Sequence, residues 1–204
     1  HYARNFRTRE QSREGYYKFI EKYGHLTKKV EKNFYLVPKG NSLLDFQTYK
    51  MIMMSSGLSF TECDLPNEIS HECGCIKTDE RIICIELFRE FFTKKLKNNL
   101  FLNKKITIKN NIGNSIVDGK IYDYVINCTW GHLDKKDGFY FEATILLYYK
   151  LKNINNADKA WTFVDGNLCS IYPTENKLIY TLSSVLHTPL IKSKDLLKVK
   201  NFLN

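Results

Sequence analysis

Apolar residues in the first part of the chain recur at helical spacing in some segments and at strand spacing in others. Between Thr8 and Tyr23 they recur every three to four residues, and Gly24 ends the run, which predicts an amphipathic helix. The stretch NFYLVP at 33–38 predicts a strand, and the stretch at 42–54 predicts a second helix.

The next apolar segment predicts a short strand that passes directly into a long helix. The strand covers 74–80, and the helix covers 81–99 with Thr78 or Asp79 as its cap. Lysines gather near the C-terminal end of this helix, where the helix dipole favours cations. Its apolar residues share one face, which comprises Cys84, Ile85, Phe88, Phe92 and Leu96.

Strand patterns dominate the remainder of the chain. A strand is predicted at 104–109, followed by a hairpin at 114–128 that turns at Asp118 and Gly119. A short helix from Ser193 to Leu203 closes the chain. Turn residues separate four further apolar runs, at 139–151, 159–166, 168–173 and 177–185. Because helices alternate with strands early and strands cluster late, we expect an α/β chain, mixed toward α+β, with a sizeable antiparallel sheet.

Composition agrees with a folded chain and leaves several classes of partner open. Of 204 residues, 43% are hydrophobic and 14% aromatic, which argues against disorder. The formal net charge of +9 suits an anionic ligand, nucleic acid or a solvated surface, but no basic run exceeds two residues. We therefore do not expect nucleic-acid binding as a dedicated role.

Targeting signals are missing from the pattern. The opening HYARNFRTRE does not resemble a signal or transit peptide, and its start at His1 suggests the interior of a longer protein. No apolar run approaches the ~20 residues of a membrane helix, so we expect no membrane partner and a soluble, cytoplasmic protein.

Six cysteines are spaced irregularly, which favours free thiols in a reducing compartment. The segment SHECGC brings His71, Cys73 and Cys75 close together, with Cys63 upstream. These residue types could ligate zinc, but the paired CxxC spacing of structural zinc sites is missing. We therefore predict no metal site.

Three stretches carry motifs that occur together, in this order, in one known superfamily. The opening HYARNFRTREQSREGYYKFIEKY is similar to a segment of the form HYPRS followed by a helix, with matches at His1, Tyr2 and Arg4. The stretch FVDGNLCSIYPTENKLIYTLSSVLHTPL is similar to a two-strand segment with a DG…S…P core and an LSxVxxTP ending, and YDYVINCTWG, which precedes it, is similar to a strand that returns to a dinucleotide-binding sheet. In these stretches the chain resembles FAD-dependent oxidoreductases of the D-amino-acid-oxidase-like superfamily.

The resemblance implies a sheet of the FAD-binding type with helices and an antiparallel substrate-domain sheet. It divides the chain into a middle portion at 1–135 and substrate-domain strands with a short helix at 136–204. The family's N-terminal GxGxxG unit and its C-terminal flavin-binding segment would lie outside this chain, which would make it an internal fragment. Alone, it should bind FAD weakly or not at all.

The implied reaction is oxidation of an amine or hydroxyl carbon of a small-molecule substrate by hydride transfer to flavin. No catalytic side chain is predicted, because the flavin performs the redox step while the protein positions the substrate. Two other functions stay open: a non-catalytic, flavoprotein-like module that binds a ligand or partner, and a basic domain that binds anions or nucleic acid.

The resemblance also implies positions for the ligands. Contacts to FAD would come from Ile108 and from the end of the returning strand, at Asn127, Cys128, Thr129 and Gly131. Contacts to substrate would come from His1, Tyr2, Arg4, Tyr172, Tyr180 and His187. Each position also has an ordinary structural explanation, such as a strand exit, a solvated terminus or packing within a sheet.

Overall fold

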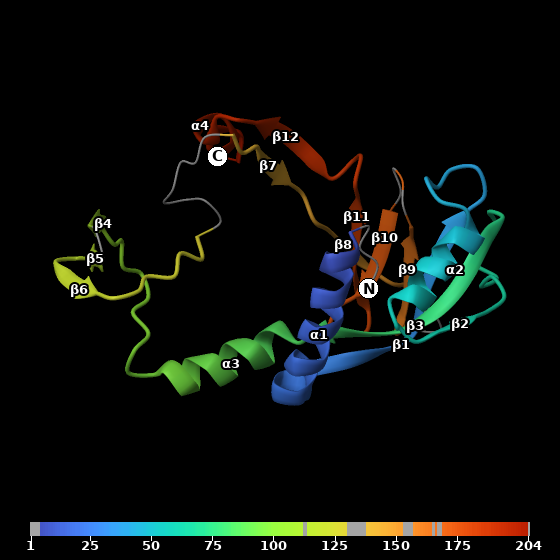
Figure 1. Ribbon diagram of the computed structural model, residues 1–204, viewed down its shortest axis with the longest axis horizontal. Coiled ribbons are helices and arrows are strands. Elements are labelled where there is room, and N and C mark those ends of the chain that lie inside the picture. The colour runs from blue at the N-terminus through green and yellow to red at the C-terminus, as the bar shows by residue number, and fades with distance from the viewer. Residues whose placement is uncertain are drawn as a thin grey trace.

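The central feature of the computed structural model is a seven-stranded sheet in the order β2-β3-β1-β9-β10-β11-β8 (Figure 1). The structure describes residues 5–111, 114–129, 138–152, 157–164, 166 and 169–203. The strands of the sheet, in that spatial order, are Phe60–Glu62, Cys73–Ile83, Thr27–Pro38, Lys159–Phe163, Cys169–Pro173, Ile179–Ser184 and Leu147–Lys150. Neighbours run antiparallel except β1 and β9, which run parallel.

Two smaller sheets extend from this body. One joins β7 (Phe141–Thr144) to β12 (Pro189–Ser193), and the other joins β4 (Ile108–Asn111), β5 (Asn114–Val117) and β6 (Lys120–Tyr122). The mixture of helices with a mainly antiparallel sheet confirms the predicted fold class. The division at residue 135 stays a prediction, although the large sheet takes strands from both sides of it.

The helices begin where the sequence supplies caps. Helix α1 (Phe6–Tyr23) starts after Asn5, whose side-chain oxygen accepts a hydrogen bond from the Thr8 backbone N–H at 3.1 Å. Helix α2 (Phe46–Ser55) starts in the same way after Asp45. The other helices are the short η1 (Gly24–Leu26), α3 (Ile85–Leu96) and α4 (Leu196–Leu203). No helix of the described residues is long and apolar enough to cross a membrane.

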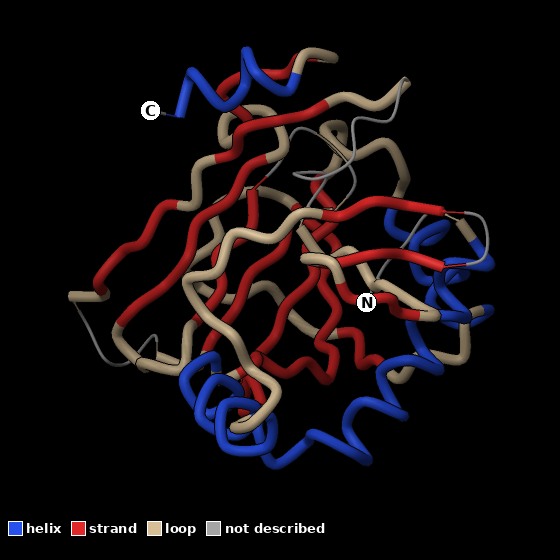
Figure 2. Tube along the Cα trace, turned by 90° about the vertical axis from the view of Figure 1, so that its left-hand side faces the viewer, coloured by secondary structure: helices blue, strands red, loops and turns tan. Residues whose placement is uncertain are grey.

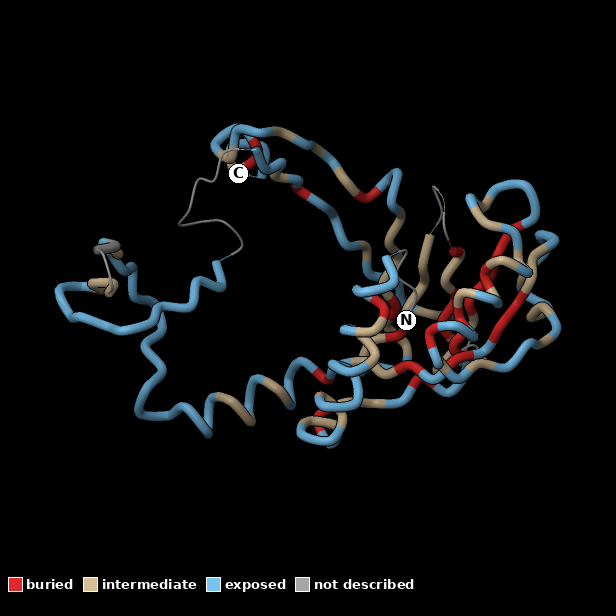
Figure 3. The backbone as a smooth tube through the Cα atoms, viewed as in Figure 1, coloured by how far each residue is buried: buried red, intermediate tan, exposed pale blue. Residues whose placement is uncertain are grey.

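Side chains that alternate along β1 build a core on each face of the large sheet. Tyr35 points to the side covered by α2, and Leu36 points to the side covered by the connection between β2 and β3. The α2-side core comprises Tyr35, Val37, Tyr49, Met53, Ile76 and Val164. The opposite core comprises Leu36, Cys75, Trp161 and Tyr180. The buried positions therefore concentrate in this sheet (Figure 3).

An aromatic cluster holds the end of α1 against α3. The rings of Phe19 and Phe88 are stacked with centroids 5.9 Å apart, and Tyr23 contacts Phe88, Phe91 and Phe92. Such ring pairs add stabilisation beyond the apolar area that they bury. The cluster therefore fixes how α3 leaves the body.

The predicted start of the third helix was wrong. Strand β3 continues to Ile83, because 81–83 pair with 27–29 of β1, and α3 begins only after Cys84. Thr78 and Asp79, predicted as helix caps, lie inside β3. Pairing with β1 thus decided a boundary that the local pattern left ambiguous.

The predicted hairpin is confirmed, but its second strand is shorter than expected. Val117 pairs with Lys120 around Asp118 and Gly119, which both have positive φ, at 48° and 82°. Positive φ at both central residues is the signature of a type I′ turn. Strand β6 ends at Tyr122, and 123–129 form no regular element. Figure 1 shows that this sheet, at the end of α3, lies away from the large sheet.

The apolar run at 139–151 also divides. Strand β7 pairs with β12, which the sequence did not predict, whereas β8 forms an edge of the large sheet. The two-stranded ribbon rises from the large sheet and carries α4 at its far end (Figure 2). Helix α4 begins at Leu196, three residues later than predicted.

Candidate functional site

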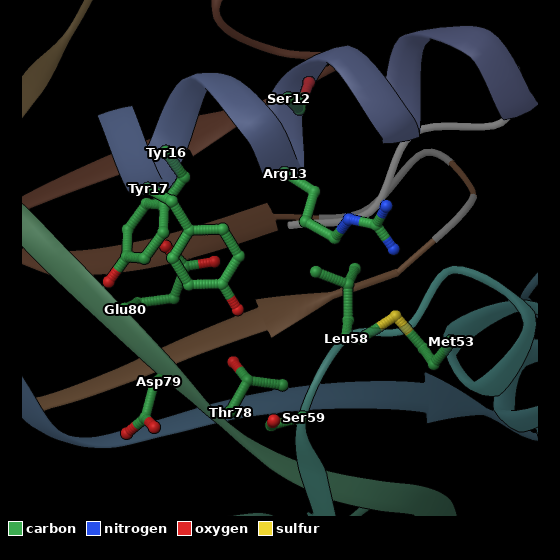
Figure 4. Close-up of a pocket in the computed structure, with 10 residues that line it drawn as sticks. All are labelled: Ser12, Arg13, Tyr16, Tyr17, Met53, Leu58, Ser59, Thr78, Asp79 and Glu80. Atoms are coloured by element: carbon green, nitrogen blue, oxygen red, sulfur yellow. The ribbon is translucent and has the colours of Figure 1, made fainter. Parts of the chain in front are cut away.

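A cleft of about 570 Å³ lies between α1 and the face of the large sheet that also carries α2 (Figure 4). Its lining combines aromatic, hydroxyl and charged side chains, namely Ser12, Arg13, Tyr16, Tyr17, Met53, Leu58, Ser59, Thr78, Asp79 and Glu80. A largely apolar concavity with a few convergent polar groups is typical of a small-molecule site.

Two arginines one helical turn apart hold α1 over this cleft. The Arg9 Nε donates to Ser56 Oγ at 2.8 Å, and Arg13 Nη1 donates to the Ser56 carbonyl at 2.8 Å. Gly57 follows with φ at 62°, and a Cβ there would lie 2.7 Å from Arg13 Nη1. The turn after α2 therefore favours glycine because of its backbone, and Arg13 would have to shift if a Cβ were added there.

Buried hydrogen bonds connect three strands beneath the cleft. Asn33, fully buried on β1, donates from Nδ2 to Thr78 Oγ1 at 2.7 Å and accepts from the Tyr172 hydroxyl at 3.0 Å. Two residues along β1, the Tyr35 hydroxyl donates to Glu80 Oε1 at 3.0 Å. Polar groups buried in this way are costly unless they are paired, so the network fixes β1, β3 and β10 relative to one another.

Burial controls the protonation of the two phenols in this network. Desolvation, followed by the proximity of Tyr172 and Glu80, raises the pKa of Tyr35 well above its ordinary value. Desolvation and Glu80 likewise raise the pKa of Tyr172. Both hydroxyls therefore keep their protons at neutral pH and can donate hydrogen bonds.

The two acidic residues of the cleft point in different directions. Figure 4 shows the Glu80 carboxylate directed toward Tyr16 and Tyr17, whereas Asp79 is directed away from α1. Asp79 pairs with Lys29, with 3.2 Å between Nζ and Oδ1. Glu80 is thus the acidic group that faces the cleft, and it can accept a hydrogen bond from a bound hydroxyl or amine.

A second cleft of about 580 Å³ lies on the opposite face of the sheet. One wall comes from the connection between β2 and β3, at 68–71. The remaining lining residues are Leu147, Phe163, Cys169, Leu182, Ser184, His187 and Thr188. This cleft is more apolar and carries no buried hydrogen-bond network comparable to that of Asn33 among the described residues.

The structure does not gather the predicted substrate residues at one place. Tyr172 belongs to the network under the first cleft, and His187 lines the second. Tyr180 is buried in the core of the opposite face, where its hydroxyl accepts from the Lys159 backbone N–H at 3.2 Å. His1, Tyr2 and Arg4 lie outside the described residues. The roles of all six stay predictions.

The predicted cofactor residues lie in or after the small three-stranded sheet. Ile108 begins β4, and Asn127, Cys128 and Thr129 are exposed in the segment after β6. Asn127 Oδ1 accepts from the backbone N–H and hydroxyl of Thr129, at 3.0 and 2.7 Å. Gly131 lies outside the described residues.

These residues do not by themselves fit the diphosphate of FAD. A dinucleotide cradle needs free backbone N–H groups in a glycine-rich turn at a helix N-terminus. In the part of the chain that the structure describes, α1 has Asn5 as its N-cap, and the Asn5 side chain already accepts a hydrogen bond from the Thr8 backbone N–H. The Asn127 side chain likewise accepts from the backbone N–H of Thr129, two residues along. The described residues therefore form a cleft but no such cradle.

Several residues of the first cleft escaped prediction. Asn33 lies within a strand that the sequence predicted, but nothing local shows that its side chain meets Tyr172, 139 positions away. Glu80 fell at the misplaced boundary between strand and helix. The spacing of Arg9 and Arg13 on one helical face was the available signal that α1 has a polar anchor.

A curated protein aligns with most of this chain. The FAD-dependent monooxygenase FPY4 of Fusarium mangiferae is 43% identical over 194 residues, which cover 93% of this chain and 52% of that protein. This chain thus spans about half the length of its relative. No family model matches, and no solved structure matches.

The comparison supports a relationship to FAD-dependent oxidoreductases, as the sequence resemblance predicted. It does not address the D-amino-acid-oxidase-like superfamily, which stays a prediction.

Proposed function

We propose that this chain forms the substrate-side portion of an FAD-dependent oxidoreductase of the monooxygenase type. The observation that carries the proposal is the 43% identity to an FAD-dependent monooxygenase over nearly the whole chain. The cleft between α1 and β3 supports it, because its size and mixed lining suit an organic substrate with polar groups.

In this proposal FAD, when bound, supplies the redox chemistry, and the side chains of this chain bind and orient the substrate. Glu80 accepts a hydrogen bond from a substrate hydroxyl or amine, and Tyr35 orients the Glu80 carboxylate by donating to Oε1. Tyr16 and Tyr17 provide aromatic walls from α1. Preorganised contacts of this kind reduce the entropy lost on reaching a reactive geometry.

The described residues lack a diphosphate cradle, so we infer that this chain alone retains FAD weakly or not at all. For the whole protein we propose FAD as the cofactor.

Oxidation of an amine or hydroxyl carbon by hydride transfer is the second candidate reaction. It is favoured by the resemblance of the segment from Phe163 to Leu190 to oxidases of that chemistry. Labelled molecular oxygen distinguishes the two reactions. A monooxygenase incorporates one labelled oxygen atom into its product, whereas an oxidase leaves the product unlabelled and releases hydrogen peroxide.

The proposal is tested on the protein expressed from its complete reading frame. We expect a flavin absorbance spectrum and substrate-dependent oxygen uptake. Glu80→Gln should lower the apparent affinity for substrate about ten- to a hundredfold, since a hydrogen bond to a charged group contributes roughly 1.5–3 kcal/mol. The flavin spectrum should not change.

Asp79→Asn is the matched control, because Asp79 neighbours Glu80 on β3 but points away from α1. It should change the apparent affinity less than about twofold. Absence of flavin from the purified protein would contradict the proposal and favour a non-catalytic binding module. If the two substitutions had equal effects, the cleft between α1 and β3 would not be the substrate site.

A further inference from the structure

Two cysteines face each other at the end of the β2–β3 ladder. The ladder pairs Glu62 with Ile76, and the Cys63 backbone N–H donates to the Cys75 carbonyl at 3.1 Å, which extends the pairing by one residue. The two Sγ atoms are 3.4 Å apart. A disulfide requires about 2.05 Å, a separation that small side-chain rotations can reach from this position.

The two thiols differ in their access to solvent. Cys75 is 2% exposed and packs with Leu36 and Trp161, whereas Cys63 is half-buried at the edge of the same core. Burial, together with the neighbouring Cys63 sulfur, raises the pKa of the Cys75 thiol far above its ordinary value. Cys63 is therefore the thiol that a dissolved reagent can reach first, and Cys75 can respond only to a sulfur already attached there.

The segment between these cysteines forms a wall of the second cleft. Glu68, Ile69, Ser70 and His71 line the same cleft as His187. Glu68 also forms an ion pair with Lys159 of β9, which holds the segment on the sheet. A bond between Cys63 and Cys75 would close this segment into a covalent loop and so restrict the movement of that wall.

We propose that Cys63 and Cys75 form a reversible disulfide by exchange with a low-molecular-weight disulfide such as oxidised glutathione. The Cys63 thiolate attacks one glutathione sulfur, the glutathione disulfide breaks, and one glutathione leaves as a thiolate. Cys75 then gives its proton to that thiolate or to water and attacks Cys63 Sγ, which expels the second glutathione. The two cysteines lose two electrons and two protons, and glutathione disulfide gains them.

The test equilibrates the protein in buffers of different ratios of reduced to oxidised glutathione. Free thiols are then trapped by alkylation in denaturant and located by mass spectrometry. We expect Cys63 and Cys75 to become protected together in oxidising buffer and to be recovered in excess reduced glutathione. Cys73 and Cys84 should stay alkylatable throughout.

Single substitutions assign the pair. Cys63→Ser should abolish protection of Cys75, and Cys75→Ala should leave Cys63 either alkylatable or in a mixed disulfide. Cys84→Ser is the control, because Cys84 lies at the start of α3, and it should titrate like the parent protein. Cys63→Ser at a half-buried position keeps the test valid even if the buried Cys75→Ala variant does not fold.

Four results would overturn the proposal. Both thiols could stay alkylatable in oxidising buffer, or Cys63 could pair with Cys73 instead. The parent protein could stop at the glutathione adduct of Cys63. Finally, the bond could persist in excess reduced glutathione, which would make it a permanent cross-link rather than a reversible one.

Discussion

The large sheet and the segment that follows α3 are built from similar apolar residues but bury them very differently. Leu36 and Ile76, in the sheet, are 0% exposed. Tyr124 and Ile126, in the segment at 97–129 that we call the arm, are 90% and 87% exposed. Figure 3 shows the same contrast, with buried positions confined largely to the sheet and its covering elements.

The contrast shows that an apolar pattern specifies a buried face only when another element lies against it. In the sheet, α1, α2 and the β2–β3 connection cover the two faces. In the arm, the described order comes from backbone pairing in β4–β6 and from the turn at Asp118 and Gly119. Side-chain packing therefore stabilises the sheet, whereas turn chemistry shapes the arm.

The largest difference should come from shortening one isoleucine in each region. Ile76→Ala leaves a cavity in a fully buried core and should lower the free energy of unfolding by about 2–5 kcal/mol. Ile126→Ala should change it by less than about 0.5 kcal/mol, since that side chain is exposed. Urea denaturation followed by circular dichroism measures both. Equal losses would mean that the arm packs as tightly as the sheet.

Glycine substitutions should separate a packing cost from a backbone cost. A Cβ at Gly74 would lie 2.0 Å from the Phe46 ring, so Gly74→Ala should cost about 1–3 kcal/mol through displacement of α2. At Gly119 a Cβ meets open space, but φ is 82°, so Gly119→Ala should cost about 1 kcal/mol and only in the hairpin. Hydrogen exchange locates each effect.

Replacing Phe46 with Leu in the Gly74→Ala variant tests the cause. The smaller side chain should recover part of the lost stability, and the two changes should be clearly non-additive. If the double variant simply summed the two losses, contact with Phe46 would not be the reason that position 74 needs glycine.

Alkaline pH should destabilise the sheet through its buried phenols. Folding raises the pKa of Tyr35 and Tyr172 above their unfolded values near 10, so the protonated phenols contribute stability that is complete below that pH. This contribution is lost as the pH rises toward the folded pKa values. The free energy of unfolding should therefore fall above about pH 10.

Tyr35→Phe should flatten that decline, because it removes the most strongly perturbed phenol while keeping the ring. The matched control is Tyr124→Phe in the arm, where the ring is 90% exposed. Denaturant titrations at a series of pH values give the comparison. A decline that is unchanged in Tyr35→Phe would show that other groups cause it.

The smallest difference concerns ion pairs. Lys28 Nζ lies 2.6 Å from Asp158 Oδ1, partly buried between β1 and the start of β9, and Asp158→Asn should cost up to about 1 kcal/mol. Burial opposes ionisation of Asp158, but Lys28 and Lys177 outweigh it and lower the pKa, so this stability should be lost as the pH falls. Breaking the exposed pair of Lys104 and Asp118 in the arm with Lys104→Gln should leave global unfolding unchanged. High salt should reduce only the first effect.

Local pattern predicted those elements whose order depends on nearby residues. The amphipathic spacing of α1 and the Asp118-Gly119 turn were sufficient to predict both elements. The boundary between β3 and α3 failed, because residues 81–83 suit a helix as well as a strand and only pairing with β1 selects the strand. Likewise, nothing in the local sequence indicates that β7 and β8 belong to different sheets.

The first cleft was mostly invisible in the sequence for the same reason. Its network joins Asn33, Thr78 and Tyr172, which come together only when β1 lies between β3 and the β9–β10 pair. Of these, Tyr172 was named as a substrate residue through the family resemblance. Long-range register has no signature in a short window, so polar residues inside strands were read as isolated positions.

The parallel pairing of β1 with β9 has a consequence for synthesis of the protein. Its register pairs Phe34 with Trp161. During synthesis β1 can therefore pair with β3 on one edge long before β9 is available to pair with its other edge. At typical translation rates that delay is on the order of ten seconds, during which an apolar strand edge stays open. Contacts of such high sequence separation slow folding and invite pairing between nascent chains. Ribosome-bound chains should therefore depend on chaperones until β9 has emerged.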